Sequence, residues 1–517
     1  MPLAFLVWAV LAAFIASRAA DFMNRVLSTD PVAVAFAEGG DDAYYYLAIA
    51  RNIGAGKGIT IDGEHWTTGF QPLWQAVTSL AFLVGRDERT AFALVYLASF
   101  ACWLAGLLLF LRFVRIAATA PLPALAPPLL AAAFLCEAHL NLLYFSGLDA
   151  GLALTLGLAL MVAFHDHLRG LPATPGRLAA LGALAGLFML ARNDGVFLFV
   201  ALMAVTLLPG TRPRPLREGL VIGLVASLLV LPWLAYCQLT WGYPMPQSGV
   251  ATSNSLYPPI GFDRLLRYLA HSLVPIYFVK QRGAMDALPI ALLVVPIAAV
   301  ALGLAAWRWR DRSAAIEPRA RLVLAALAAA CLGLLAYYQA MSGAGQFFTR
   351  YFAPMKLLAL IVLSLFVLHA VAGATDPRPA RLALPTLAML AIGSNLYWVW
   401  RDHGLPYRSY LGFEVYEIAR TPLGQGTSRI GAPESGRLGY RYPARVVNLD
   451  GKARVDALAA MRKGEMAPLI RDAHLDWLLL SDEFVAMYDR VAVGWRDDFQ
   501  PAGRLGFFNV FARTRGP

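Results

Sequence analysis

Cysteine is scarce in this sequence, with four residues among 517. All of them lie inside apolar runs, and none belongs to a CxxC pair: Cys102, Cys136, Cys237 and Cys331. Structural zinc sites and disulfide frameworks use cysteines that are paired or regularly spaced. The sequence therefore predicts neither a disulfide framework nor a structural zinc site.

Charged side chains are also few, at 15% of the residues, whereas 59% are hydrophobic. This balance lies outside the range of ordinary soluble domains. A helix needs about 20 residues to cross ~30 Å of hydrocarbon. Apolar runs that could form such helices occur at 2–20, 70–85, 90–111, 117–145, 146–165, 177–191, 194–209, 218–240, 286–306, 320–341, 351–372 and 381–400. We predict a polytopic all-α membrane bundle of about 11–13 transmembrane helices in residues 1–400.

Lysine is absent from the short loops, where arginine marks one side of the membrane. Arginine without lysine occurs in five loops: 86–89, 169–177, 212–217, 308–321 and 378–381. Because basic residues are enriched in cytoplasmic loops, we place these loops in the cytoplasm and the loop 21–69 outside it. Arg112 and Arg115 also look cytoplasmic, which strict alternation of the spans does not allow. A short or re-entrant segment within 70–145 would explain this conflict.

The composition changes after the last apolar run, where the apolar stretches shorten and charge becomes mixed. "ARVVNLDG" (444–451) is typical of a strand that ends in a turn, and "LDWLLLS" (475–481) of a buried strand. Residues 455–471 between them have the pattern of an amphipathic helix. We therefore predict that residues 401–517 form a small soluble α/β domain on the extracytoplasmic side, of a size typical of one domain.

Two classes of ligand are not expected. "GAGKG" lacks the upstream glycine and the following Ser or Thr of a Walker A loop, so it does not indicate nucleotide binding. The net charge of +11 is spread through the loops and is not gathered among aromatic side chains. Nucleic acid is therefore not an expected partner, whereas the anionic lipid of a bilayer is.

One polar stretch, "GGDDAYYYLAIARNIGAGKGITIDGEHWTTGFQPLW" (39–74), follows the first apolar run. Asp41 and Asp42 start a helix, where carboxylates suit the N–H groups and the positive end of the helix dipole. The residues after them have amphipathic spacing, which would suit a helix on the membrane surface. Capping alone would account for the two acids. The density of polar groups at a membrane border favours a functional site instead.

The segment that begins at Asp41 resembles the first extracytoplasmic loop of bacterial GT-C-fold glycosyltransferases. These enzymes use polyprenyl-phosphate sugars and include protein mannosyltransferases, the aminoarabinose transferases of lipid A and mycobacterial arabinofuranosyltransferases. Weaker matches follow in the expected order: "SGLDAGLAL", "LARNDGVFL", "YPMPQSGVATS", "TRYFAP" and "VVNLDG". The chain departs from the family pattern at Asn193, where proline is common, and at Thr68, where asparagine is common.

The resemblance implies a GT-C fold and an inverting transfer of a single sugar from a polyprenyl-phosphate donor. The acceptor would be an envelope glycan, a glycolipid or a protein. The resemblance maps the catalytic base onto Asp41, with Asp42 orienting the acceptor or sharing the proton. It also implies a multi-pass protein of the bacterial inner membrane, with the active site and the C-terminal domain on the periplasmic face.

A departing phosphate needs cationic or N–H donors. Four cations at the ends of the bundle are candidates for this role: Arg350, Lys280, Arg282 and Arg192. Each could instead reach the lipid headgroups from an interfacial position. Expected substrate contacts are Tyr45, His65, Thr68, Gln71 and Tyr351. Asp149 is either a helix cap or a further substrate contact, and the donor lipid is expected between apolar helices near 241–282 and 342–356.

His65 has no second ligand at metal spacing, so the sequence predicts no zinc site and no cofactor beyond the lipid-linked substrate, and dependence on another divalent metal stays open. Two other functions stay open. An oligosaccharide ligase of the same fold would transfer a whole glycan from a diphosphate lipid. A transporter or flippase of lipid-linked sugars would be expected to have repeated halves with broken helices, and the sequence has no evident internal repeat.

Overall fold

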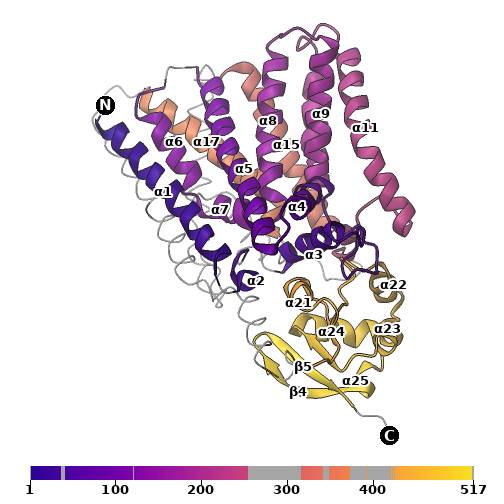
Figure 1. Cartoon of the computed structure of the whole chain (residues 1–517). Coiled ribbons are helices and arrows are strands. Elements are labelled where there is room, and N and C mark those ends of the chain that lie inside the picture. The colour runs from indigo at the N-terminus through magenta and orange to yellow at the C-terminus, as the bar shows by residue number, and fades with distance from the viewer. Residues whose placement is uncertain are drawn as a thin grey trace.

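The computed structural model describes residues 2–28, 30–36, 41–119, 122–253, 316–341, 348–372 and 426–514, with four isolated positions besides these. A bundle of helices stands on a smaller α/β domain at the C-terminal end of the chain (Figure 1). In the described residues, five helices are long and apolar enough to cross a membrane: α1 (Pro2–Val26), α5 (Glu88–Ala117), α8 (Ala150–Leu168), α11 (Pro215–Trp241) and α15 (Pro318–Met341).

Shorter apolar helices pack beside these five. They are α4 (Pro72–Val84), α9 (Pro175–Ala191), α10 (Val196–Thr206) and α17 (Ala353–Ala372). The apolar run at 117–145 forms two helices, α6 (Ala126–Leu135) and α7 (Ala138–Phe145), which are bent by 62° relative to each other. The predicted helical membrane bundle is thus confirmed. The runs at 286–306 and 381–400 lie outside the described residues.

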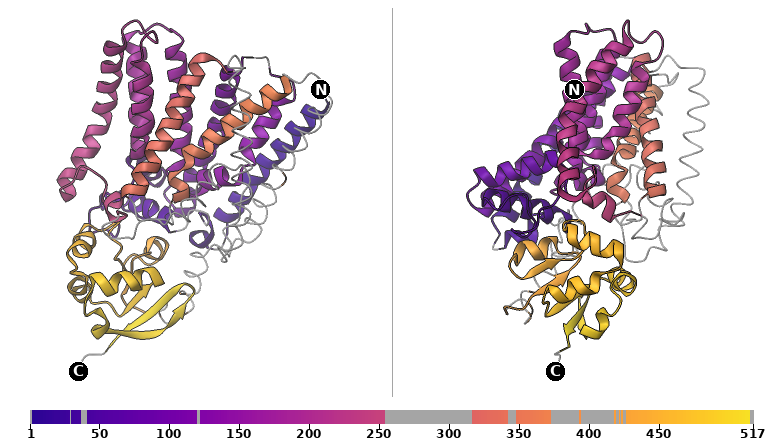
Figure 2. Two further views of the ribbon diagram at one scale, coloured as in Figure 1. Left: turned by 180° about the vertical axis from the view of Figure 1, so that it is seen from behind. Right: turned by 90° about the vertical axis from the view of Figure 1, so that its right-hand side faces the viewer.

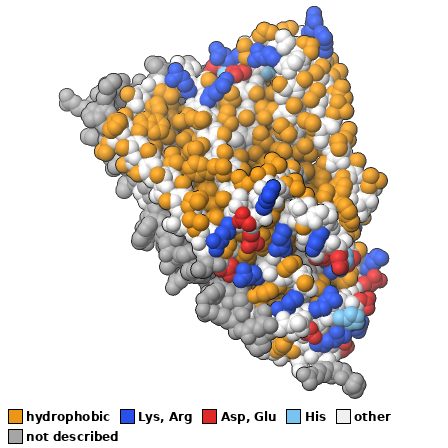
Figure 3. All heavy atoms as spheres, in the orientation of Figure 1, with side chains coloured by type: hydrophobic (Ala, Val, Ile, Leu, Met, Phe, Trp, Pro, Cys, Tyr) orange, Lys and Arg blue, Asp and Glu red, His pale blue; other side chains and the backbone are white. Residues whose placement is uncertain are grey.

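The surface of the bundle carries a broad apolar band, with charged side chains gathered at its two ends (Figure 3). α11 contributes a row of leucines that are each 60% to 73% exposed: Leu216, Leu220, Leu224 and Leu228. So much exposed apolar surface is costly in water, but it suits contact with lipid tails. The chain is therefore a multi-pass membrane protein.

The loop at 86–89 lies on the side of the C-terminal domain, because Glu88 is next to Tyr440 of that domain. Arg112 instead pairs with Asp166 at a distance of 2.8 Å, near the end of α8 that is remote from the domain. Assigning 86–89 to the same side as the other arginine loops was therefore wrong. The reason is that α4 has 13 residues, which span only about 20 Å and cannot cross ~30 Å of hydrocarbon.

The polar stretch forms α3 (Asp42–Gly54), as its spacing predicts. The helix does not lie exposed on a membrane surface. It packs between α4 and the short helix α21 (Gly436–Arg441) of the C-terminal domain. Tyr44, Tyr45 and Tyr46 are all buried. The apolar positions of α3 are thus covered by protein, because the C-terminal domain folds back onto the first loop.

The C-terminal domain contains a five-stranded sheet in the order β2-β1-β3-β5-β4. Its strands are β1 (Ile430–Ala432), β2 (Val446–Asn448), β3 (Trp477–Leu480), β4 (Phe499–Leu505) and β5 (Phe508–Arg513). β1 pairs in parallel with β2 and β3, whereas β5 is antiparallel to β3 and β4. The predicted α/β domain and its two predicted strands, now β2 and β3, are confirmed.

Helices cover this sheet and connect its strands (Figure 2). The predicted helix at 455–471 is divided into α22 (Val455–Lys463) and α23 (Met466–Asp472). Gly464 separates them with a φ of 75°, a conformation that glycine adopts readily at helix ends. Two further helices, α24 (Asp482–Val491) and α25 (Trp495–Asp498), follow β3. The predicted domain boundary near 401 lies outside the described residues.

Candidate active site

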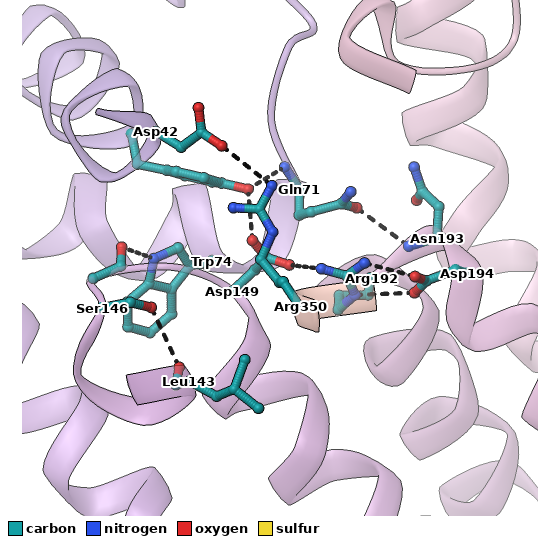
Figure 4. A network of polar contacts seen from close by, with 12 residues as sticks. Asp42, Gln71, Trp74, Leu143, Ser146, Asp149, Arg192, Asn193, Asp194 and Arg350 are labelled. Carbon is teal, nitrogen blue, oxygen red and sulfur yellow. Dashed lines mark hydrogen bonds and ion pairs between the residues drawn. The ribbon is translucent and has the colours of Figure 1, made fainter. Parts of the chain in front are cut away.

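A cavity of about 300 Å³ lies where the helical bundle meets the C-terminal domain. Its walls come from α3, the segment 69–71, α12 (Gln247–Ala251), α15 and the C-terminal domain. Among the residues that the structure describes, six charged side chains line it: Asp42, Asp149, Asp194, Arg192, Arg350 and Lys452. Ligand pockets typically have volumes of ~300–1,000 Å³ and a few converging polar groups. This cavity is therefore the candidate active site (Figure 4).

The two adjacent acids at the start of α3 point to different partners. Asp41 is 8% exposed, and its carboxylate accepts hydrogen bonds from the backbone N–H groups of Gly436 and Arg437 at 2.6 and 2.8 Å. Asp42 lines the cavity instead. Neighbouring residues of a helix project about 100° apart, which is why one acid meets the C-terminal domain and the other meets the cavity.

Asp41 therefore docks the C-terminal domain onto the first loop. Burial raises the pKa of Asp41, although the two backbone N–H donors act in the opposite direction. The approach is close, since a Cβ atom at Gly436 would lie 2.1 Å from the Asp41 carbonyl oxygen. Sequence analysis placed the catalytic base at Asp41. Its oxygens are engaged by the domain, and the acid that faces the cavity is Asp42.

Arg350 reaches the cavity from α16 (Phe348–Tyr351). Its Nη2 atom lies 3.2 Å from Oδ2 of Asp42, with the two side chains 20% and 15% exposed. Its guanidinium group is 5.5 Å from the ring centre of Tyr351, and that ring stacks on Tyr338. Two residues that the sequence assigned to substrate binding, Arg350 and Tyr351, are thus brought to Asp42. Partial exclusion of water strengthens electrostatic contacts there.

Arg192 is held by two carboxylates. It donates to Asp149 at 2.9 Å and to both oxygens of Asp194 at 3.0 and 2.6 Å. Tyr46 donates to Asp149 at 3.2 Å, and Tyr338 donates to Asp194 at 2.6 Å. Because one guanidinium already meets two negative charges, this geometry disfavours Arg192 as a phosphate ligand. Its observed contacts link the starts of α8 and α10 across the cavity wall.

Tyr45 and Thr68 both connect to the C-terminal side of the cavity. The Tyr45 hydroxyl donates to Asp450 at 2.7 Å, and burial raises the pKa of Asp450 to about 6. The Thr68 N–H donates to the side-chain oxygen of Gln247 at 3.0 Å. Gln247 in turn donates to the Gly451 carbonyl oxygen at 3.3 Å. Tyr45 lines the cavity and Thr68 does not.

Of the two other predicted substrate contacts in the first loop, Gln71 lines the cavity and His65 does not. Gln71 lines the cavity; its N–H donates to the Tyr46 hydroxyl at 3.0 Å, and its side-chain oxygen accepts from the Asn193 N–H at 3.2 Å. The His65 side chain is 41% exposed and lies 2.7 Å from Asp62, a contact that raises the pKa of His65. Gln71 is therefore placed to meet a substrate, whereas His65 lies outside the cavity.

Two of the predicted phosphate ligands, Lys280 and Arg282, lie outside the described residues. Within the described part of the chain, no three His, Cys, Asp or Glu side chains are grouped so that they could hold a metal ion. The expectation that the protein has no zinc site and no cofactor stays a prediction.

No protein-family model matches the chain, and no curated protein is similar to its sequence. Solved structures are similar in fold. ArnT from Cupriavidus metallidurans bound to undecaprenyl phosphate has a TM-score of 0.50 and 15% identity over 99% of both chains. Archaeal oligosaccharyltransferase AglB from Archaeoglobus fulgidus, in complex with an inhibitory peptide and a dolichol-phosphate, has a TM-score of 0.55 and 12% identity; the match covers 98% of this chain and 74% of AglB.

This chain has the GT-C fold. Within that fold, the cavity includes charged residues that sequence analysis did not assign to the site, namely Asp194 and Lys452. The Asp149 side chain does not cap its helix; it contacts Arg192 and lines the cavity. Two features of the sequence indicate Asp149, Asp194 and Lys452. Asp149 and Asp194 are acids within apolar surroundings, which favours a functional position, and Lys452 directly follows "VVNLDG".

Docking of the C-terminal domain in this GT-C fold should depend on Gly436. A Cβ atom there would meet the Asp41 backbone, so we expect Gly436→Ala to destabilise the docked state by about 1–3 kcal/mol, the usual cost of overpacking. Thermal unfolding and limited proteolysis at the junction would measure this loss. Gly439→Ala is the matched control, because a Cβ atom there would have its nearest neighbour, Val446, at 3.8 Å. Equal stability of the two variants would contradict the docking role.

Proposed function

We propose that this protein is an inverting glycosyltransferase that moves a single sugar from a polyprenyl-phosphate donor to the hydroxyl group of an extracytoplasmic acceptor. The observation that carries the proposal is one cavity at the membrane border in which the Asp42 carboxylate lies 3.2 Å from the Arg350 guanidinium. A carboxylate can take the proton of an attacking hydroxyl, and a guanidinium suits a phosphate. The solved GT-C structures with undecaprenyl phosphate and dolichol-phosphate support a lipid-phosphate substrate.

Asp42 would be the base in this reaction, in place of Asp41. The acceptor oxygen attacks the anomeric carbon from the face opposite the phosphate, and Asp42 takes the hydroxyl proton. The bond between the anomeric carbon and the phosphate oxygen breaks, and the phosphate leaves with the electron pair. Arg350 stabilises the charge that develops on it. A single displacement of this kind inverts the configuration of the anomeric carbon.

The ion pair between Asp42 and Arg350 gives the reaction an order. While Arg350 holds Asp42, the carboxylate is engaged by the guanidinium group and does not meet an acceptor hydroxyl. The donor phosphate is also an anion that suits the guanidinium, and it would replace Asp42 there. Asp42 would then be released to contact the acceptor hydroxyl once the donor is in place. This order would protect the donor from attack before the site is complete.

The isoprenoid tail of the donor would begin at an apolar crevice beside the cavity. Arg192 and Asp194 border both spaces. The crevice is lined mainly by small and aliphatic side chains of α8, α10, α15 and α17, among them Ala153, Gly157 and Ala330. Burying isoprene units against such a surface would contribute about 25 cal/mol per Å² of apolar area. Ala353 also lines the crevice, in agreement with the predicted lipid region at 342–356.

The size of the cavity favours a single sugar over a whole oligosaccharide, because about 300 Å³ is at the lower end of the range for ligand pockets. The proposed setting is the inner membrane of a bacterium, with the cavity and the C-terminal domain on the periplasmic face. This sidedness agrees with the arginines of 169–177 and 212–217, which lie at the opposite end of the bundle. Acceptors would be envelope glycans, glycolipids or proteins.

The experiment uses purified full-length protein in nanodiscs with radiolabelled polyprenyl-monophosphate sugars and an envelope extract from cells that lack the gene. We expect transfer of label to an acceptor, release of polyprenyl phosphate and inversion at the anomeric carbon. Transfer only from a polyprenyl-diphosphate oligosaccharide would indicate a ligase instead. Movement of the lipid across vesicles without any transfer would indicate a flippase, and either result would overturn the proposal.

A further inference from the structure

The C-terminal domain contributes Lys452 to the wall of the cavity. Lys452 follows β2 in a tight turn, in which its N–H donates to the Asp450 carboxylate at 2.8 Å. Its carbonyl oxygen packs against the first loop so closely that a Cβ atom at Gly69 would lie 1.9 Å from it. The side chain is therefore positioned by main-chain contacts on both sides, and it is only 8% exposed.

Formal charges show what Lys452 adds to the cavity. In the part of the chain that the structure describes, three carboxylates and two arginines line the wall besides Lys452. Asp149 and Asp194 share Arg192, and Asp42 pairs with Arg350. Without Lys452 these groups carry a net charge of minus one, which would repel an entering phosphate. Lys452 brings the formal charge of these six lining groups to zero, which lowers their repulsion of an entering phosphate.

Two acids of the domain, Asp450 and Glu434, lie close to Lys452, and burial raises the pKa of both while the charge of Lys452 lowers it. Both carboxylate oxygens of Asp450 accept other hydrogen bonds, one from the Tyr45 hydroxyl and one from the Lys452 N–H. Burial raises the pKa of Glu434 to about 7, so this acid is about half protonated near neutral pH. A doubly charged phosphate would therefore be a stronger partner for the ammonium group.

We propose that Lys452 is a donor-phosphate ligand that acts together with Arg350, so that the C-terminal domain supplies part of the active site. This inference rests on the proposed function, because it assumes a polyprenyl-phosphate donor. One phosphate ligand would come from α16 of the bundle and the other from the soluble domain. The site is then complete only when the domain is docked, and Asp41 at the start of α3 helps to hold it there.

The test measures binding of polyprenyl phosphate and of uncharged polyprenol of equal chain length to the full-length protein in nanodiscs. Lys452→Met keeps the apolar stem and removes the charge, so polyprenyl phosphate should bind about 10- to 150-fold more weakly, the effect of losing one charged hydrogen bond. Binding of polyprenol should not change. Lys463→Met is the matched control, because Lys463 is an exposed lysine of the same domain. Wild-type affinity of Lys452→Met for polyprenyl phosphate would overturn the proposal.

A second measurement needs no variant and so does not depend on folding of Lys452→Met. Lysines of the wild-type protein are labelled by reductive methylation and quantified by mass spectrometry. Polyprenyl phosphate should protect Lys452, polyprenol should not, and Lys463 should be methylated equally in both. Equal labelling of Lys452 with both lipids would overturn the inference alone. A wild-type protein that does not bind polyprenyl phosphate would instead overturn the proposed function together with it.

Discussion

Asp42→Asn should lower turnover by about 10²–10⁴-fold, the usual contribution of a general base, while donor binding is kept or becomes tighter. The substitution preserves the shape of the side chain but removes its affinity for a proton. It also removes the negative charge that competes with the donor phosphate for Arg350, 3.2 Å away. Single-turnover transfer with a labelled donor, together with donor affinity from a binding assay, would separate these two effects.

Asp41→Asn is the matched control, because it makes the same chemical change one residue earlier. Asparagine keeps one oxygen to accept from the backbone N–H groups of Gly436 and Arg437, so we expect a less stable docked domain and a smaller loss of turnover. Transfer at the wild-type rate by Asp42→Asn, with transfer abolished in a folded Asp41→Asn variant, would return the base to Asp41. Both variants must therefore be compared at temperatures at which each remains folded.

Arg350→Ala should weaken binding of polyprenyl phosphate by about 1–3 kcal/mol, which corresponds to roughly 5- to 150-fold in affinity. The guanidinium group lines the cavity and is 20% exposed, so its contact with a phosphate would be only partly screened by water. Arg350→Lys should recover part of the affinity, since it restores the charge but not the forked geometry. Titration with polyprenyl phosphate in nanodiscs would measure both variants.

Arg86→Ala is the control for this series. Arg86 is exposed and lies on the same side of the bundle as the cavity, so its loss should leave lipid binding unchanged. Shortening the isoprenoid should weaken wild-type protein and both Arg350 variants by the same factor, because the apolar tail contacts a different surface. If Arg350→Ala binds polyprenyl phosphate as tightly as the wild type, the phosphate site must lie elsewhere, with Lys280 and Arg282 as the next candidates.

The architecture of the molecule follows from local features of the sequence. Long apolar runs predicted the helices of the bundle, because a membrane-spanning helix satisfies its own backbone hydrogen bonds and needs only apolar side chains. The short apolar runs after 401 likewise predicted β2 and β3. The acidic pair was recognised from the segment around it. Each of these signals lies within one continuous stretch of the chain, the longest being 39–74.

The roles of individual site residues were decided only by contacts between distant segments. Asp41 and Asp42 are neighbours in sequence and chemically identical, yet one meets Gly436 of the C-terminal domain and the other meets Arg350. The sequence predicted that Arg192 binds phosphate. In the structure its guanidinium group forms ion pairs with Asp149, at the start of another helix, and with Asp194. Packing of remote elements fixes which face of a helix is covered and which charges are already paired. A linear pattern of residues therefore identifies the groups that can do chemistry, whereas the tertiary structure decides which of them face the cavity.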